Sequence, residues 1–176
     1  MGEIPKEWKP AGTGEEEFDI PLYDTEGGLN AADTNIQFFD QGEAAVGIDE
    51  TNMPKASELP STQRFLVKKI EVFVNDVSAA ADEHTMLDRS VLEMKINSKR
   101  VFVAPLRLLM GGATVLPAGV TQDEDHVAGF GYDLDRYIVI PGGTQFSVVI
   151  ETAQTATGAD MELTVALRGR WVRPAA

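Results

Sequence analysis

The chain contains no cysteine and only two histidines, His84 and His126, among its 176 residues. The absence of cysteine excludes a disulfide framework, a thiol nucleophile, an iron–sulfur cluster and a zinc ribbon. Neither histidine is accompanied by a nucleophile-elbow sequence of the G-x-S-x-G type, and they are too few and too far apart to cluster around a metal. We therefore expect surface histidines, and we predict no catalytic residue, no cofactor and no metal site.

Basic residues are also scarce, because 15 Lys and Arg stand against 28 Asp and Glu and give a formal net charge of −13. Phosphate binding requires a basic face, so we expect no direct binding to nucleic acid. No stretch approaches the roughly 18 uninterrupted apolar residues of a membrane-spanning helix. The first ten residues lack the apolar core of a secretory signal, so we expect none.

The negative charge is concentrated near the N-terminus. Residues 1–50 carry 13 acidic and 2 basic side chains, whereas residues 51–100 carry 7 and 8 and residues 101–176 carry 8 and 5. We predict an extended acidic N-terminal arm over residues 1–33, rich in proline and glycine, followed by a β-domain over residues 34–176. Either the arm is a solvated tail, or Trp8 and the alternating Phe18, Ile20 and Leu22 anchor it on its own domain or on a neighbouring subunit.

From residue 34 onward the hydrophobic residues repeat with a period of two, which indicates strands. The predicted strands cover residues 34–40, 64–75, 91–97, 100–106, 127–132, 137–140, 145–151 and 161–168. In the second of these, Phe65 and Val67 have one parity and Ile70 and Val72 the other, so we predict a β-bulge or a change of sheet near Lys68 and Lys69. Residues 78–89 are the only predicted helix, and residues 41–62 read as a long polar loop.

This pattern predicts an all-β fold, a single antiparallel eight-stranded jelly roll (a β-sandwich or barrel) with at most one short helix. The uneven loops favour it over an up-and-down barrel. An immunoglobulin sandwich fits less well, since neither tryptophan lies in a mid-chain strand and the cysteine pair is missing.

Two groups of charged residues are candidate sites. Arg168 and Arg170 beside Trp171 share a strand face and predict a small anion site, a subunit contact or a solvated edge. The run Asp123-Glu124-Asp125 and the pair Asp133 and Asp135 offer oxygen ligands for Ca²⁺ but do not match the calcium-loop pattern, so we expect solvated acidic groups.

Several short segments resemble a known family. These are Thr34-Asn35-Ile36-Gln37-Phe38-Phe39-Asp40, Thr51-Asn52-Met53, Leu59-Pro60 followed by Phe65, Val67 and Ile70, then Ile140-Pro141-Gly142-Gly143-Thr144-Gln145-Phe146, and finally Leu167-Arg168-Gly169 with Arg173-Pro174. In this order they resemble the small single jelly-roll major capsid proteins of tailless, membrane-containing icosahedral phages and archaeal viruses, the sphaerolipovirus-like group. The resemblance covers roughly residues 34–174.

The resemblance implies a structural virion protein rather than an enzyme. Such a protein is a major capsid subunit that self-associates as a homo-oligomer and packs with a second capsid protein into an icosahedral shell, around an inner viral membrane and a double-stranded DNA genome. The implied location is the virion, with host cytoplasm during assembly. The candidate subunit contacts come from the residues themselves, because the resemblance does not account for residues 1–33: they are Trp8, Phe18, Ile20, Leu22, Arg168, Arg170 and Trp171. The alternatives are a minor capsid or decoration protein, or a jelly-roll module that binds carbohydrate or a receptor through Phe130, Tyr132 and Tyr137.

Overall fold

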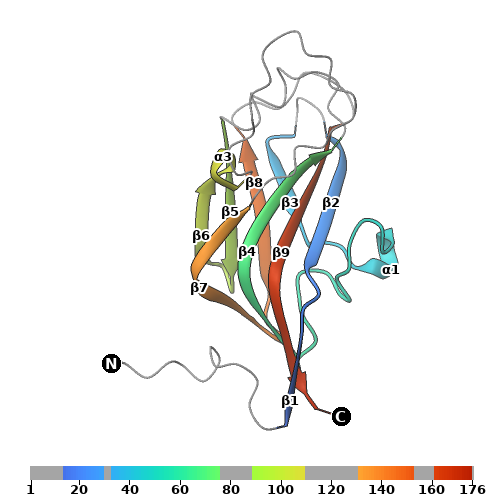
Figure 1. Ribbon diagram of the computed structural model, residues 1–176. Coiled ribbons are helices and arrows are strands. Elements are labelled where there is room, and N and C mark those ends of the chain that lie inside the picture. The colour runs from blue at the N-terminus through green and yellow to red at the C-terminus, as the bar shows by residue number, and fades with distance from the viewer. Residues whose placement is uncertain (1–13, 30–32, 76–88, 110–130, 153–160, 176) are drawn as a thin grey trace.

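A computed structural model describes residues 14–29, 33–75, 89–109, 131–152 and 161–175. These residues form two antiparallel β-sheets and two short helices (Figure 1). In chain order the elements are β1 (Glu15–Phe18), β2 (Leu22–Leu29), β3 (Asn35–Phe38), α1 (Glu43–Val46), β4 (Arg64–Asn75), β5 (Ser90–Ile96), β6 (Lys99–Pro105), α3 (Leu106–Leu109), β7 (Tyr132–Pro141), β8 (Phe146–Thr152) and β9 (Met161–Pro174). Among the described residues, no helix is long and apolar enough to cross a membrane.

The first sheet, sheet A, has the order β1-β9-β4-β7, with β2 also paired to β9. The second, sheet B, has the order β3-β8-β5-β6. From β2 onward each successive strand crosses to the other sheet, except between β5 and β6, which form a hairpin. The chain is therefore an all-β sandwich, as the period-two pattern predicts.

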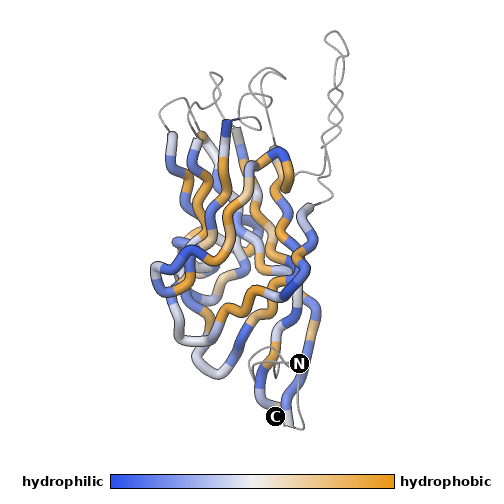
Figure 2. Tube along the Cα trace, turned by 90° about the vertical axis from the view of Figure 1, so that its left-hand side faces the viewer, coloured by the Kyte–Doolittle hydropathy of each residue, from blue (hydrophilic) through white to orange (hydrophobic). Residues whose placement is uncertain are grey.

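The core lies between the two sheets and is made by alternate residues of the strands (Figure 2). Leu92 and Met94 of β5, Val148 and Ile150 of β8 and Leu163, Val165 and Leu167 of β9 are completely buried. These are the residues that the alternation places inward. Glu93 points outward but is only 4% exposed, since Lys95 and Arg100 cover its carboxylate with two ion pairs.

The predicted β-bulge in β4 is confirmed. The register of β4 shifts between Val67 and Lys69 against both β7 and β9. Phe65, Val67, Ile70 and Val72 are consequently all fully buried although their parities differ. Gly169 faces the bulge, where a Cβ atom would lie 1.9 Å from the carbonyl oxygen of Leu66.

Three expectations about the elements are wrong in detail. At most one short helix is expected in the chain, but the described residues hold two four-residue helices, α1 and α3, in segments without helical periodicity. The helix predicted at residues 78–89 lies almost entirely outside the described residues. The strand expected at residues 137–140 is the end of the longer β7. After residue 34 the described residues hold seven strands, β3 to β9, against the eight expected, since all but the last two residues of the strand expected at 127–132 lie outside the described residues; β1 and β2 add two strands within the predicted arm.

The long loop between β3 and β4 is tied to β2 by the segment Thr51-Asn52-Met53. The side-chain amide of Asn52 accepts a hydrogen bond from the Tyr23 backbone N–H (3.0 Å) and donates one to the Pro21 carbonyl (2.6 Å). Thr51 donates from its hydroxyl to the Tyr23 carbonyl (3.1 Å), and Met53 is completely buried. A segment without regular structure is thereby held against the sheet by hydrogen bonds that a neighbouring strand would otherwise make.

Candidate functional site

Two of the predicted contact residues, Phe18 and Trp171, lie opposite each other in a two-stranded ribbon formed by β1 and the C-terminal end of β9, and Ile20 and Arg170 lie at its base. Glu15 is opposite Pro174 and Phe18 is opposite Trp171. Strand β4 begins at Arg64, which is opposite Val172, so the tip of the ribbon extends past the end of β4. Figure 1 shows this ribbon projecting below the sandwich.

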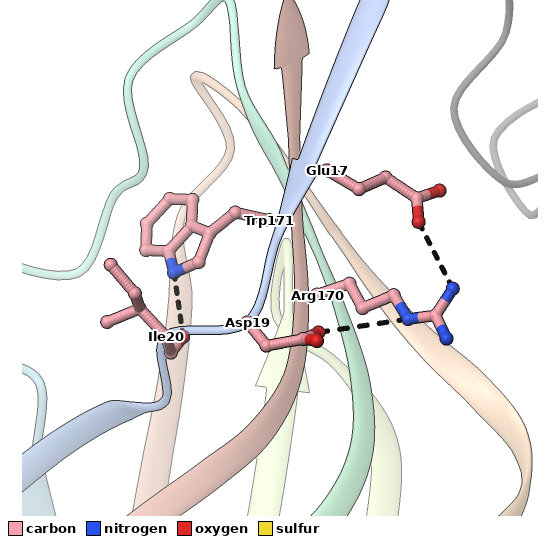
Figure 3. Close-up of polar contacts among 5 residues, drawn as sticks. All are labelled: Glu17, Asp19, Ile20, Arg170 and Trp171. Atoms are coloured by element: carbon pink, nitrogen blue, oxygen red, sulfur yellow. Dashed lines mark hydrogen bonds and ion pairs between the residues drawn. The ribbon is translucent and has the colours of Figure 1, made fainter.

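Ion pairs link the two strands of the ribbon and its base. Glu15 binds Arg64 through both carboxylate oxygens (2.8 and 3.1 Å). Arg173 pairs with Glu16 (3.1 Å), and Arg170 pairs with Glu17 (3.1 Å) and lies 3.8 Å from Asp19 (Figure 3). The acidic run of the predicted arm thus neutralises arginines near the other end of the chain.

An aromatic cluster covers the side of the ribbon base opposite to Arg170, and the Arg173 guanidinium lies over its Phe18 ring at 5.0 Å from the centroid. Trp171 stacks on Phe18 with ring centroids 5.9 Å apart and an angle of 5° between the planes, and it meets Phe65 edge-on at 5.3 Å. Its indole N–H donates to the Ile20 carbonyl (2.9 Å), so Trp171 and Arg170 point to opposite faces of β9 (Figure 3). This cluster joins the ribbon to the sandwich core, since Phe65 is fully buried.

The predicted contact residues therefore differ in what they expose. Leu22 is completely buried and Trp171 is 5% exposed, so both side chains pack within the subunit. Phe18 is half-buried, and Ile20 is 51% exposed. Trp8 lies outside the described residues. Phe18 and Ile20, with Glu16, Glu17 and Arg173, line a shallow hollow of about 600 Å³.

Arg168 and Arg170 are both exposed but paired within the chain. Arg168 binds Glu71, which is 4% exposed and also pairs with Lys69 (2.8 Å). Of the three alternatives for these arginines, a vacant anion site has the least support, because their guanidinium groups already contact carboxylates.

A second feature is a cluster of three carboxylates that periodicity did not single out. One carboxylate oxygen from each of Asp24, Glu26 and Asp40 lies within 4.8 Å of the others. Asp24 and Glu26 share one face of β2, and Asp40 follows β3. Asp24 and Glu26, with Gln41, Glu50 and Glu162 among the other lining residues, border a cavity of about 290 Å³. In the sequence only the alternation of Asp24 and Glu26 indicates this cluster, because Asp40 is brought to it by the tertiary contact between β2 and β3.

Burial shifts the acidity of this cluster. It raises the pKa of Asp24 to about 6, and the nearby charges of Asp40 and Glu50 contribute a smaller part of this increase. Hydrogen bonds from the Phe39 N–H and the Thr51 hydroxyl favour the ionised carboxylate and therefore oppose the increase. Burial together with the charges of Asp24, Asp40 and Glu50 raises the pKa of Glu26 to about 7. Asp24 is 2% exposed, so its charge is poorly solvated. Three such oxygens are ligand types for a hard cation, but they make up only part of a calcium shell.

The other candidate metal-ligating, catalytic and carbohydrate-binding residues do not form a site within the described structure. Asp133 and Asp135 are both exposed on β7, and the run at residues 123–125 lies outside the described residues, as do both histidines and Phe130. Tyr132 packs against Phe102 with ring centroids 5.6 Å apart, and the ammonium group of Lys68 lies 5.7 Å from the ring centroid of Tyr137.

Comparisons with known proteins add no identification. No protein-family profile matches the chain, and no curated protein matches it.

Proposed function

We propose that this chain is a structural virion protein, a major capsid subunit with a single jelly-roll fold that self-associates and packs with partner capsid proteins into an icosahedral shell. The observation that carries the proposal is the strand order. Sheet orders of β2-β9-β4-β7 and β3-β8-β5-β6, with the chain crossing between sheets at nearly every step, are those expected when a long hairpin of four strand pairs is rolled into a sandwich.

A fold alone does not specify a function, so the proposal also rests on the residues that resemble the capsid family. Several of them have structural roles here. Asn52 connects the long loop to β2 through its two side-chain hydrogen bonds. Gly142 allows the turn after β7 to approach the Pro60 carbonyl oxygen, which would lie only 2.3 Å from a Cβ atom at position 142. These residues hold the connections at one end of the sandwich, and a shell subunit needs connections of fixed shape to meet its neighbours.

The charge distribution is consistent with the partners that the resemblance implies. The acidic run of β1 pairs with arginines of the same chain, so the ribbon offers no basic surface to DNA. We propose that the chain contacts a second capsid protein and an inner viral membrane, makes no direct contact with nucleic acid, and resides in the virion after assembly in host cytoplasm.

Assembly of the purified chain tests this proposal. We expect oligomers whose mass, measured by light scattering, rises with protein concentration, and particles containing the chain in electron micrographs. The copy number per particle distinguishes a major capsid subunit from a minor or decoration protein. A chain that stays monomeric alone and with every other protein of its virion would refute the proposal. In a separate titration with DNA, tight binding that weakens with salt would contradict the absence of nucleic-acid contact.

A further inference from the structure

The two lateral edges of the sandwich carry opposite charge. In sheet B, β6 forms one edge and β3 the other. Helix α1 follows β3 and lies on the side of the molecule away from β6 (Figure 1). These edges are distinct from the ribbon described above.

The β6 edge is basic and has exposed apolar residues. Residues 89–109, which include β5, β6 and α3, contain five basic side chains and one acidic side chain. We define the basic edge by its exposed charges, Lys99, Arg100 and Arg107, and by its exposed apolar residues: Val91 (37% exposed), Val101 (41%), Val103 (44%) and Leu108 (53%). Lys99 and Arg107 form no ion pair with any residue that the structure describes.

The α1 side is acidic and also has an exposed apolar residue. Residues 40–50 contain four acidic side chains and no basic one. We define the acidic lobe by Glu43, Asp49 and Glu50, which are exposed, together with Ala44, Ala45 and Ile48. Ile48 is 64% exposed, the highest value among the exposed large hydrophobic residues of the described structure.

The β6 strand is also a free edge. Within the described residues it pairs only with β5, so one row of its backbone N–H and C=O groups has no strand partner. An open edge beside exposed valines favours contact with another polypeptide. Its basic side chains select an acidic partner surface and disfavour a second basic edge, because like charges repel.

We propose that two copies of this chain associate head to tail, with the basic edge of one copy against the acidic lobe of the next. Each copy carries both surfaces, and they complement each other in charge while both offer apolar side chains to bury. Such a contact leaves the opposite surface of each copy open, so it generates rings where the rotation closes. This inference rests on the proposed function, for which it names the contact surfaces.

Charge reversal at the two surfaces tests the contact. The edge variant carries Lys99→Glu and Arg107→Glu, and the lobe variant carries Glu43→Lys and Asp49→Lys; none of these side chains is buried. The double-reversal variant carries all four changes and keeps the net charge of −13. Circular dichroism and thermal unfolding verify that each variant is folded, and sedimentation velocity at low and at physiological salt measures association.

We expect the association constant of each single-surface variant to be lower than that of the wild type by a factor of about ten or more. A mixture of the edge and lobe variants regains association, because the acidic lobe of one meets the basic edge of the other and the two reversed surfaces also match. The double-reversal variant associates like the wild type, and added salt weakens all of these contacts.

Each alternative outcome contradicts a distinct claim. If the wild type associates and the variants associate equally well, the head-to-tail contact is wrong while the proposed function stands. If only the edge variant is impaired and mixing does not rescue it, the contact is between two like surfaces. If the wild type assembles only with a second virion protein, copy-to-copy docking is refuted and the capsid role remains. A wild type that never assembles refutes both.

Discussion

The carboxylate cluster of Asp24, Glu26 and Asp40 predicts that stability falls as the pH rises from about 4 to about 7. Burial raises the pKa of Asp24 from 3.8 to about 6, so the folded chain holds a proton that the unfolded chain has already released. The stabilisation from this proton is complete below about pH 4 and is lost as the pH passes 6. Glu26, whose pKa rises to about 7, extends the loss to slightly higher pH.

The size of the effect follows from the shift. A rise from 3.8 to about 6 corresponds to about 3 kcal/mol between pH 4 and pH 8. The free energy from the raised pKa of Glu26 cannot simply be added to that of Asp24, because part of the increase at Glu26 comes from repulsion between the same two carboxylates. Asp24→Asn mimics the protonated carboxyl and keeps an oxygen that accepts the Phe39 N–H. We therefore expect the variant to gain about 2–3 kcal/mol on the wild type between pH 4 and pH 8.

Urea unfolding at several pH values from 4 to 8, with a chelator present, measures this difference. The chelator keeps stray divalent cations from neutralising the cluster. Asp133→Asn is the matched control, because Asp133 is exposed on β7 and its loss should leave the pH profile of the wild type unchanged. If the difference between Asp24→Asn and the wild type stays constant from pH 4 to pH 8, the pKa of Asp24 is not raised by folding and the reasoning is wrong.

Three further predictions concern the ribbon, the bulge and the outer face of sheet B. Trp171→Ala removes the stack on Phe18 and the edge contact with Phe65, and we expect a loss of about 3–5 kcal/mol in urea unfolding, with a smaller loss for Trp171→Phe. Gly169→Ala should lower the melting temperature strongly, since its Cβ would meet the Leu66 carbonyl, whereas Gly27→Ala has its nearest contact at 3.8 Å and should change it little; equal effects would refute the close approach. Glu93→Gln should destabilise the chain at neutral pH, because Arg100 and Lys95 hold the pKa of Glu93 below its ordinary range. That stabilisation is lost on acidification, so the free energies of unfolding of wild type and variant should converge at low pH. A difference that persists at low pH would contradict this prediction.

The core and the bulge were predictable because they depend on side-chain parity. The change of parity between Val67 and Ile70 allows only a bulge or a change of sheet if both residues are to be buried, and the register shift lies where it was expected. The strands predicted at residues 91–97 and 100–106 leave room only for a tight hairpin turn between them, and in the structure Asn97 and Ser98 adopt the left-handed backbone conformation (φ of 48° and 62°) that such a turn requires.

The ribbon was predictable only in part. The alternation of Phe18, Ile20 and Leu22 suggests one continuous strand, but the chain leaves the sheet between Phe18 and Leu22, so β1 and β2 are separate. Ile20 consequently points to solvent and its carbonyl accepts the indole N–H of Trp171. No local pattern indicates that Glu16 and Glu17 will meet Arg173 and Arg170, because those partners are more than 150 positions away.

By itself, the sequence determined the all-β class, the inward-facing residues of most strands and the position of the bulge. These properties arise from alternation along a single strand, which is local. Only the tertiary structure decided which strands are neighbours, that the acidic run is neutralised by arginines of β9, and that Asp40 joins Asp24 and Glu26. Such contacts depend on how two sheets cross and on where loops return, and the free energy that selects them is shared among side chains far apart in the chain.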